Sequence, residues 1–203
     1  MIKRIIFDID GTLITGVNFS SYVTNTFKRY GIENIENTKQ FLLNIKEYEN
    51  THNCYDRNLY LNFFSNKIGC ELDYHFLEIF FQELRKAIPK NTKGIKSMLS
   101  GLSDYELVLL SNYFEESQRN RLTSMGINDF FIEYYGESII KPNELAYRQA
   151  QGIYKPGECV VVGDDKRLDI DVPKSLGFKT IYVNENGDIK RVEDLSPRLI
   201  KKL

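Results

Sequence analysis

The chain has 203 residues, with 27 Lys and Arg against 28 Asp and Glu, and a formal net charge of −1 at pH 7. This length suits one domain, or a core domain with a small insertion, and the balanced charge argues against a nucleic-acid partner. No apolar run reaches the roughly 20 residues of a membrane-spanning helix, so we expect no membrane partner. A strand follows the N-terminus directly, and three scattered cysteines predict reduced thiols, so we expect a cytoplasmic protein.

The first predicted element is a buried strand that ends in two carboxylates. The apolar run 5–7 (Ile-Ile-Phe) is typical of a strand covered on both faces, and Asp8 and Asp10 follow it. Alternation along a strand would point both acidic side chains to the same side. Two carboxylates this close repel unless a cation lies between them, which indicates a divalent metal such as Mg²⁺. A plain Asp-Gly turn at Asp10-Gly11 is the alternative.

A helical insertion is predicted between residues 16 and 89. Ser20 or Ser21, Asn37 or Thr38, Asp56 and Asp73 could cap four helices, which end at Gly31, about Glu49, Gly69 and Pro89. The insertion carries 14 of the 26 Phe and Tyr residues, so we expect aromatic packing in its core.

Three residues near one predicted loop of the insertion are open to two interpretations. Solvent exposure is favoured for His52, Tyr55 and Arg57. The alternative hypothesis is that this segment lies over the site and determines which leaving group is accepted. His52 and His75 are the only histidines, too few for a metal site, so we expect surface or packing positions.

From residue 90 onward, helices and strands alternate. Helices are predicted at 94–102, 115–125, 141–151 and around Pro173 to Gly177, with a weakly helical tail at 192–202 interrupted by Pro197. Strands are predicted at 105–110, 130–135, 159–162 and 178–183. This alternation predicts an α/β fold with a doubly wound parallel sheet of order 3-2-1-4-5, a Rossmann-like core. Strands one and four meet where the order reverses, so Asp8 and Asp164 should be neighbours there.

Further polar residues follow the other predicted strands. Ser111 and Asn112 end the second strand, and Ser111 alone could be an ordinary helix cap. Lys141 stands before Pro142 at the start of a helix, although a single lysine is usually a solvated surface residue. Residues 163–169 (Gly-Asp-Asp-Lys-Arg-Leu-Asp) place three acids after the fourth strand.

Taken together, these stretches resemble the signatures of the haloacid dehalogenase-like (HAD) hydrolase superfamily. The stretch Asp8-Ile9-Asp10-Gly11-Thr12 resembles the first signature, and Ser111, Lys141-Pro142 and 163–169 resemble the other three in order. The resemblance covers nearly the whole chain, and the insertion resembles the C1-type helical cap of the phosphoglycolate phosphatase and beta-phosphoglucomutase group. It implies a core domain of residues 1–15 and 90–203 and a helical cap domain of residues 16–89.

The resemblance also implies a role for each site residue. Asp8 would be the nucleophile that forms an aspartyl-phosphate, and Asp10 the general acid and base. Mg²⁺ would be held by Asp8, Asp164 and the backbone carbonyl of Asp10. The phosphoryl group and substrate would be bound by Gly11, Thr12, Ser111, Asn112 and Lys141. Asp169 would act through water or hold Lys141, and Asp165 would mainly start a helix.

One departure from the family pattern lies after Asp169. Asp171-Val172-Pro173 stands where the family often has small residues, and we expect this to shift the helix slightly without removing a catalytic group.

The predicted function is a Mg²⁺-dependent phosphatase that hydrolyses a small phosphorylated metabolite. A phosphomutase of the beta-phosphoglucomutase type is the first alternative, and a phospho-accepting receiver-like signalling module is the alternative from another class. A haloacid dehalogenase is disfavoured because Asp10 is present, and a dinucleotide-binding domain because no GxGxxG follows the first strand. The sequence indicates neither the substrate nor the oligomeric state.

Overall fold

A five-stranded parallel sheet forms the centre of the protein. The computed structural model describes residues 1–32, 34–88 and 92–203. The strands are β1 (Arg4–Phe7), β2 (Glu106–Leu110), β3 (Glu133–Tyr135), β4 (Cys159–Gly163) and β5 (Lys179–Tyr182). They pair in the order β3-β2-β1-β4-β5, and every pairing is parallel. The predicted α/β fold with a doubly wound sheet is therefore confirmed.

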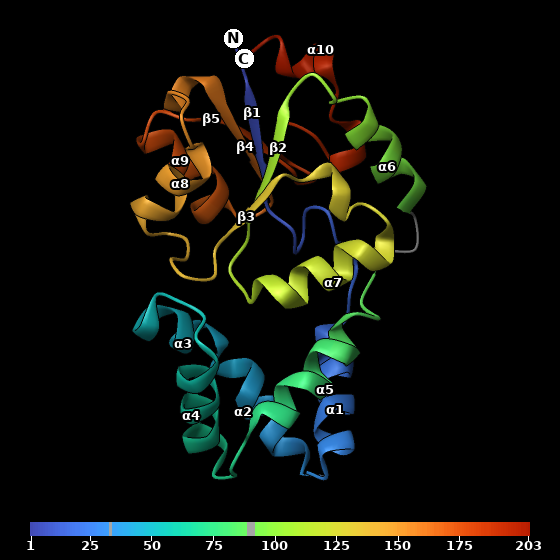
Figure 1. Ribbon diagram of the computed structural model, residues 1–203, viewed down its shortest axis with the longest axis vertical. Coiled ribbons are helices and arrows are strands. Elements are labelled where there is room, and N and C mark those ends of the chain that lie inside the picture. Colours follow the sequence, from blue (N-terminus) through green and yellow to red (C-terminus); the bar gives the residue numbers. More distant parts are fainter. Residues whose placement is uncertain (33, 89–91) are drawn as a thin grey trace.

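Helices cover both faces of this sheet (Figure 1). Ile5 and Phe7 pack with side chains from α6 (Thr92–Ser100) and α7 (Glu115–Met125) on one face. Ile6 packs with α8 (Glu144–Gln151) on the other. Because successive strand residues point to opposite faces, the short apolar run of β1 contributes to both layers of the core.

The register of the sheet brings the predicted polar residues to one edge. Phe7 lies opposite Leu109 of β2 and Val162 of β4. Asp8 therefore leaves β1 beside the ends of β2 and β4, which are followed by Ser111 and Asp164. Parallel strands place their carboxyl ends at a common edge, and ligands bind there where the strand order reverses.

Five helices form a separate layer beyond this edge of the sheet (Figure 1). They are α1 (Phe19–Tyr30), α2 (Ile35–Leu43), α3 (Ile45–His52), α4 (Arg57–Ile68) and α5 (Tyr74–Leu84). We call this layer the cap. Asp56 and Asp73 cap α4 and α5 as predicted, by accepting hydrogen bonds from the backbone N–H groups of Leu59 and Phe76. The exact domain boundaries stay predictions.

Aromatic side chains fill the interior of the cap. Phe41 is fully buried, and its ring lies 4.2 Å from that of Phe64, 5.5 Å from Phe80 and 5.6 Å from Phe27, measured between centroids. The Phe80 and Phe27 rings meet Phe41 edge to face, and such arrangements add to the free energy gained by burying the rings.

The cap also shares this aromatic cluster with the core. Phe114, which precedes α7, lies 5.3 Å from both the Tyr55 and Tyr60 rings and 5.4 Å from the Phe81 ring. The Tyr55 backbone N–H donates to the carbonyl of Glu137 at 2.7 Å. The cap therefore rests on the core through buried rings as well as through backbone hydrogen bonds.

Several predicted helix starts in the cap are wrong. The helix predicted at 40–49 is two helices, since α2 ends at Leu43 and α3 begins at Ile45, with Asn44 between them. The Asn44 side chain donates to the Gln40 carbonyl at 2.6 Å and competes with the helical backbone. Asn34 rather than Asn37 or Thr38 caps α2. Ser20 and Ser21 lie inside the first turn of α1. The predicted stop at Pro89 lies outside the described residues.

Element boundaries in the core differ in smaller ways. Asn128–Phe130 forms a 3-10 turn, so β3 begins only at Glu133. Pro142 precedes α8, because Asn143 is extended and accepts a hydrogen bond from the Leu145 N–H. Pro197 starts a short helix, α10 (Pro197–Ile200), since its fixed φ suits a first turn. None of the described helices is long and apolar enough to cross a membrane.

Phe41 tests the contribution of the cap core to stability. We expect Phe41→Ala to lower the free energy of unfolding by about 3–5 kcal/mol, because it empties a fully buried ring site. Leu43→Ala in the same helix is the control, since Leu43 is 75% exposed and should change stability by less than about 0.5 kcal/mol. Equilibrium unfolding in urea measures both, and equal effects of the two substitutions would contradict the prediction.

Candidate active site

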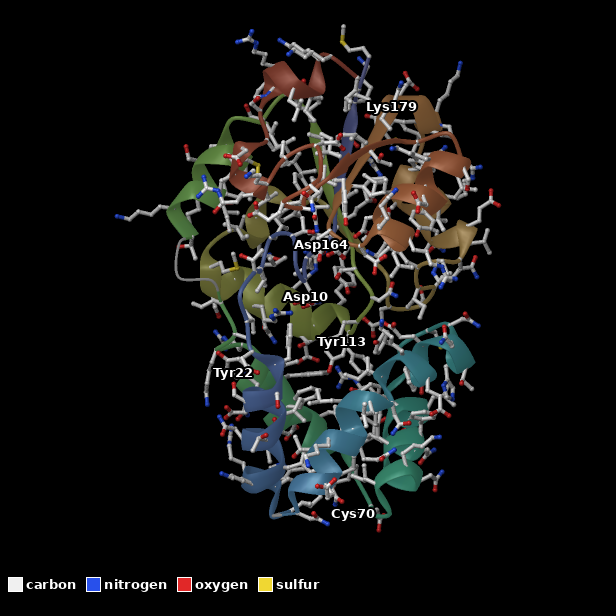
Figure 2. The ribbon with its side chains drawn as sticks, turned by 180° about the vertical axis from the view of Figure 1, so that it is seen from behind. Asp10, Tyr22, Cys70, Tyr113, Asp164 and Lys179 are labelled. Carbon is white, nitrogen blue, oxygen red and sulfur yellow. The ribbon has the colours of Figure 1, made fainter. Side chains whose placement is uncertain are left out.

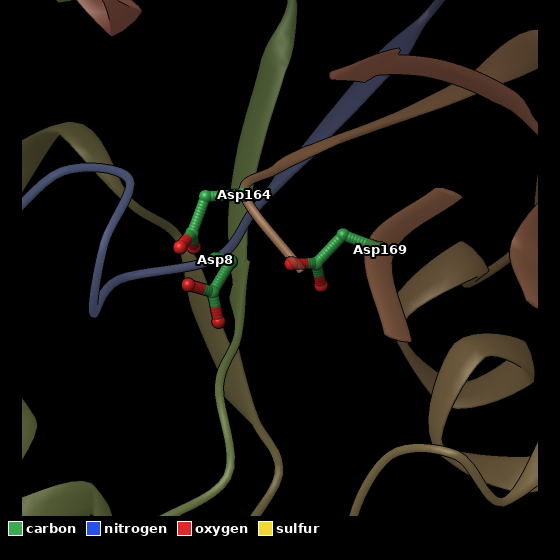
Figure 3. Close-up of side chains that lie close together, drawn as sticks. All are labelled: Asp8, Asp164 and Asp169. Atoms are coloured by element: carbon green, nitrogen blue, oxygen red, sulfur yellow. The ribbon is translucent and has the colours of Figure 1, made fainter. Parts of the chain in front are cut away.

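Three carboxylates converge where β1 and β4 end. One ligand oxygen from each of Asp8, Asp164 and Asp169 lies within 4.8 Å of the others (Figure 3). Asp8 follows β1, Asp164 follows β4, and Asp169 comes from the π-helical segment Lys166–Asp171. The predicted meeting of Asp8 and Asp164 across the sheet is thus present, and the structure adds Asp169 to the pair.

The Lys141 ammonium group lies between two of these carboxylates. Its Nζ is 2.8 Å from Asp8 Oδ1 and 2.7 Å from Asp169 Oδ1, and all three side chains are buried. The alternative of a solvated surface lysine is therefore wrong. The two carboxylates raise the pKa of Lys141 against the opposing effect of burial, so the amine stays charged.

Asn112 fixes the backbone on which Lys141 stands. Its side-chain N–H donates to the Lys141 carbonyl at 2.9 Å, and its side-chain oxygen accepts from the Lys141 N–H at 2.8 Å. Asn112, which we expected to orient substrate, here connects the end of β2 to the loop before α8.

One lysine does not balance three acids. Burial raises the pKa of Asp8, Lys141 opposes this rise, and the neighbouring Asp169 and Asp164 add to it. Burial and Asp169 also raise the pKa of Asp164. A site with excess buried negative charge and oxygen donors from three carboxylates fits a hard divalent cation such as Mg²⁺.

Two glycines let the acidic loops approach one another. Gly11 has a φ of +90°, and a Cβ at this position would lie 2.1 Å from Asp164 Oδ2. A Cβ at Gly163 would lie 2.2 Å from the carboxyl carbon of Asp169. Either side chain would push a carboxylate out of the cluster, so both positions require glycine.

The hydroxyl groups predicted to bind phosphate lie beside the cluster. Thr12 is buried, and its Oγ1 donates to Asp164 Oδ1 at 3.2 Å. Ser111 is also buried, and its Oγ accepts from Gln118 Nε2 at 3.4 Å. Their contact with a phosphoryl group stays a prediction.

Asp165 starts the segment that carries Asp169. Its Oδ1 accepts from the N–H groups of Arg167 at 2.9 Å and Leu168 at 2.8 Å, while its own N–H donates to Asp169 Oδ2 at 3.0 Å. The expected role of Asp165 as a helix start is therefore confirmed. The departure at 171–173 begins at the last residue of this π-helical segment, Asp171, which forms an exposed ion pair with Lys166.

The Asp10 carboxylate faces a different cation. Its Oδ1 accepts from Arg121 Nη2 at 2.7 Å, and its Oδ2 accepts from Arg121 Nη1 at 3.0 Å and from Gln118 Nε2 at 2.8 Å. Because β1 ends at Phe7, both acids lie beyond the strand and strand alternation does not fix the directions of Asp8 and Asp10, whose side chains have different cationic partners. The contact of the Asp10 backbone carbonyl with a metal stays a prediction.

A cavity lies between this site and the cap. It has a volume of about 200 Å³, and its walls include Asp10, Asn112 and Arg121 from the core and Glu49 and Tyr55 from the cap. Figure 2 shows Asp10 and Tyr113 at the junction of the two layers, with Asp164 deeper in the core. A small ligand in the cavity would thus touch both layers.

Comparison with known proteins agrees with this arrangement. The sequence model of the haloacid dehalogenase-like hydrolase family matches residues 2–177. The chain belongs to this family.

The relatives reported next share low sequence identity with this chain. The human N-acylneuraminate-9-phosphatase is 26% identical over 106 residues, which are 47% of this chain and 41% of that protein. The chain thus matches less than half the length of this relative. A HAD phosphatase from Thermococcus onnurineus has a TM-score of 0.59 and 25% identity, covering 97% of this chain and 92% of its own. L-2-haloacid dehalogenase from Xanthobacter autotrophicus matches with a TM-score of 0.66 and 20% identity, over 100% of this chain and 82% of the dehalogenase. This similarity shows a shared fold.

Sequence reasoning missed two residues of this HAD site, Gln118 and Arg121. Both are buried, and Arg121 is only 1% exposed. They stand on the inner face of α7 with Leu122 and Met125, where helical spacing calls for apolar side chains. Polar residues at the buried positions of an amphipathic helix were the signal that could have found them.

The three cap residues near the loop have separate environments. The His52 ring stacks on Tyr48 at 4.5 Å between centroids, which makes it a packing residue. Tyr55 is only 4% exposed, so its expected solvent exposure is wrong, and it lines the cavity. Arg57 is partly exposed and pairs with Glu116 of the core.

Replacing Asp8, which lies close to Asp164 and Asp169, should stabilise the folded protein when no metal is bound. Because burial and neighbouring acids raise the pKa of Asp8, its ionised form costs stability, and this cost grows as pH rises above the ordinary value of about 4. We expect Asp8→Asn to stabilise the metal-free protein by about 1 kcal/mol at pH 7, and by less at pH 5. Thermal unfolding in EDTA measures this.

The exposed Asp171→Asn is the matched control and should change stability by less than about 0.5 kcal/mol. Destabilisation by Asp8→Asn at pH 7 would show that the Lys141 ion pair outweighs the repulsion.

Proposed function

We propose that this protein is a Mg²⁺-dependent phosphatase that hydrolyses a small phosphorylated metabolite through an aspartyl-phosphate. The observation that carries the proposal is the position of the Asp8 carboxylate, between the Lys141 ammonium group and two further acids at the reversal point of the sheet. Membership of the HAD hydrolase family supports it, as do two relatives named as phosphatases.

Oxygen ligands for the metal are available from the acid cluster. Asp8 and Asp164 would hold Mg²⁺ directly, and Asp169 is close enough to contribute or to act through water. When bound, the ion would offset negative charge on the phosphoryl group and on the acids around it.

In the first step, an Asp8 oxygen attacks phosphorus while the ester bond to the leaving oxygen breaks. Asp10 donates its proton to that oxygen, so the product leaves as a neutral alcohol. The charged Lys141 lies 2.8 Å from Asp8 and would stabilise the equatorial oxygens of the transferring group, together with the Ser111 hydroxyl.

In the second step, water attacks the aspartyl-phosphate. Asp10 now accepts a proton from the attacking water, the phosphorus–oxygen bond to Asp8 breaks, and inorganic phosphate leaves. Both enzyme carboxyl groups thereby return to their starting forms.

Arg121 would act through Asp10. Its two Nη groups bind both carboxylate oxygens of Asp10, and Gln118 holds one of them a second time. This bidentate contact fixes the plane of the carboxylate and hence the direction of proton transfer. Arg121 is therefore proposed as a positioning residue.

A phosphomutase would use the same Asp8 and Asp10 but return the phosphoryl group to the sugar. Hydrolysis is favoured because the two relatives cited above are named as phosphatases. A receiver-like signalling module is disfavoured, because the cap would cover the phosphorylated residue.

Asp8→Asn tests the nucleophile. We expect at least about a 1,000-fold loss of phosphate release from p-nitrophenyl phosphate, because an amide cannot attack phosphorus. Wild-type activity should require added Mg²⁺ and disappear in EDTA. Asp171→Asn should retain full activity, and activity surviving in Asp8→Asn would remove the aspartyl-phosphate from the mechanism.

Arg121→Lys tests the positioning of Asp10. We expect kcat to fall about 10- to 100-fold with KM changed less than about threefold, since charge is kept but the bidentate contact is lost. Arg119→Lys is the matched control, because Arg119 lies on the same helix and pairs with Glu115 near the surface. An equal loss in kcat and rise in KM would indicate general disruption of the site instead.

A further inference from the structure

The cavity under the cap is mostly apolar. Its cap side is formed by Phe19, Val23, Leu42, Ile45, Tyr60 and Phe80, among others. Its volume of about 200 Å³ lies below the roughly 300–1,000 Å³ of typical small-molecule sites. The leaving group that fits here is therefore small and makes largely apolar contacts.

Glu49 breaks the apolar character of the cap wall. It stands on α3, and its Oε1 accepts a hydrogen bond from the Tyr55 hydroxyl at 2.9 Å. Among the described residues it forms no ion pair, and burial raises the pKa of its carboxyl group while the Tyr55 hydrogen bond opposes the rise. It is thus a partly buried acid that accepts a hydrogen bond from a neutral hydroxyl, and Asn112, Lys141 and Lys46 also oppose the rise of its pKa.

Glu49 also faces the phosphoryl side of the site. It borders a second cavity, which contains Lys141, Asn53 and Arg167, while the first contains Asp10 and Asn112. An ester with its phosphoryl group beside Lys141 and its leaving group in the first cavity would therefore pass the Glu49 carboxylate.

The cation of the first cavity is already engaged. Arg121, the cation among the described residues of that cavity, directs both Nη groups to Asp10. Lys46, Lys141 and Arg167 line the second cavity instead, and Lys141 contacts Asp8 and Asp169. A carboxylate on a leaving group within the first cavity would therefore lie near the charges of Glu49 and Asp10, and like charges repel.

We propose that Glu49 selects the substrate by binding a hydrogen-bond donor on its leaving group. The substrate class is the phosphate monoester of a small alcohol that bears an ammonium or a hydroxyl group and no carboxylate. This inference rests on the proposed phosphatase function and specifies its substrate. An ammonium group is preferred over a hydroxyl because a hydrogen bond between two charged groups is stronger than one with a neutral donor.

Three esters of matched size test the proposal. They are 2-aminoethyl phosphate, 2-hydroxyethyl phosphate and carboxymethyl phosphate, which differ in the terminal group alone. For the wild type we expect kcat/KM to fall in that order, by at least about tenfold from first to last. Phosphate release in the presence of Mg²⁺ is the readout.

Glu49→Gln should remove most of the advantage of the aminoethyl ester, by about tenfold and mainly through KM, and should raise kcat/KM for the carboxymethyl ester. Glu47→Gln is the matched control, because Glu47 lies on the same helix and pairs with Lys67 at the surface. It should leave the order of the three esters as in the wild type.

The proposal is overturned if the wild type hydrolyses the three esters equally, or if Glu49→Gln changes all three by one factor. Preference for the carboxymethyl ester would instead assign recognition to Arg121. Each of these results leaves the phosphatase function intact provided that Asp8→Asn abolishes hydrolysis. Hydrolysis that persists in Asp8→Asn would remove the proposed function and this inference with it.

Discussion

The ion pair between Lys141 and two buried carboxylates is the contact on which the site depends. Burying a charge is costly unless a partner offsets it, and here one ammonium group serves both Asp8 and Asp169. The pair connects the end of β1, the loop before α8 and the segment after β4. Asn112 extends the connection to β2 by bonding the Lys141 backbone twice. Each strand end near the site is thereby held in place by polar contacts.

Separate cations give the two acids of the first signature separate environments. Asp8 pairs with Lys141 inside the acid cluster, whereas Asp10 pairs with Arg121 of α7. In the proposed mechanism, the nucleophile Asp8 and the proton carrier Asp10 would thus each have a separate cation on a different element. The division also explains why polar residues occupy the inner face of α7, where packing alone would favour apolar ones.

The cap completes the site from the other side. Its aromatic core includes Phe114 of the core, so the cap and the start of α7 pack as one cluster. That packing places Tyr55 and Glu49 over the cavity next to Asp10. Apolar and aromatic side chains form most of the cap wall of this cavity, and Glu49 is the charged residue among those described on that wall.

The sequence by itself determined the sheet, its strand order and the acids at its carboxyl edge, because buried strands, helix stops and Gly-Asp stretches are local signals. It also located Lys141 and the caps of α4 and α5. Only the tertiary structure decided the partners of Asp10, the burial of Tyr55 and the break at Asn44. The first two depend on contacts between residues far apart in the chain, so the polar positions of α7 indicated a buried polar contact without identifying Asp10. The break depends on a side chain that competes with the helical backbone.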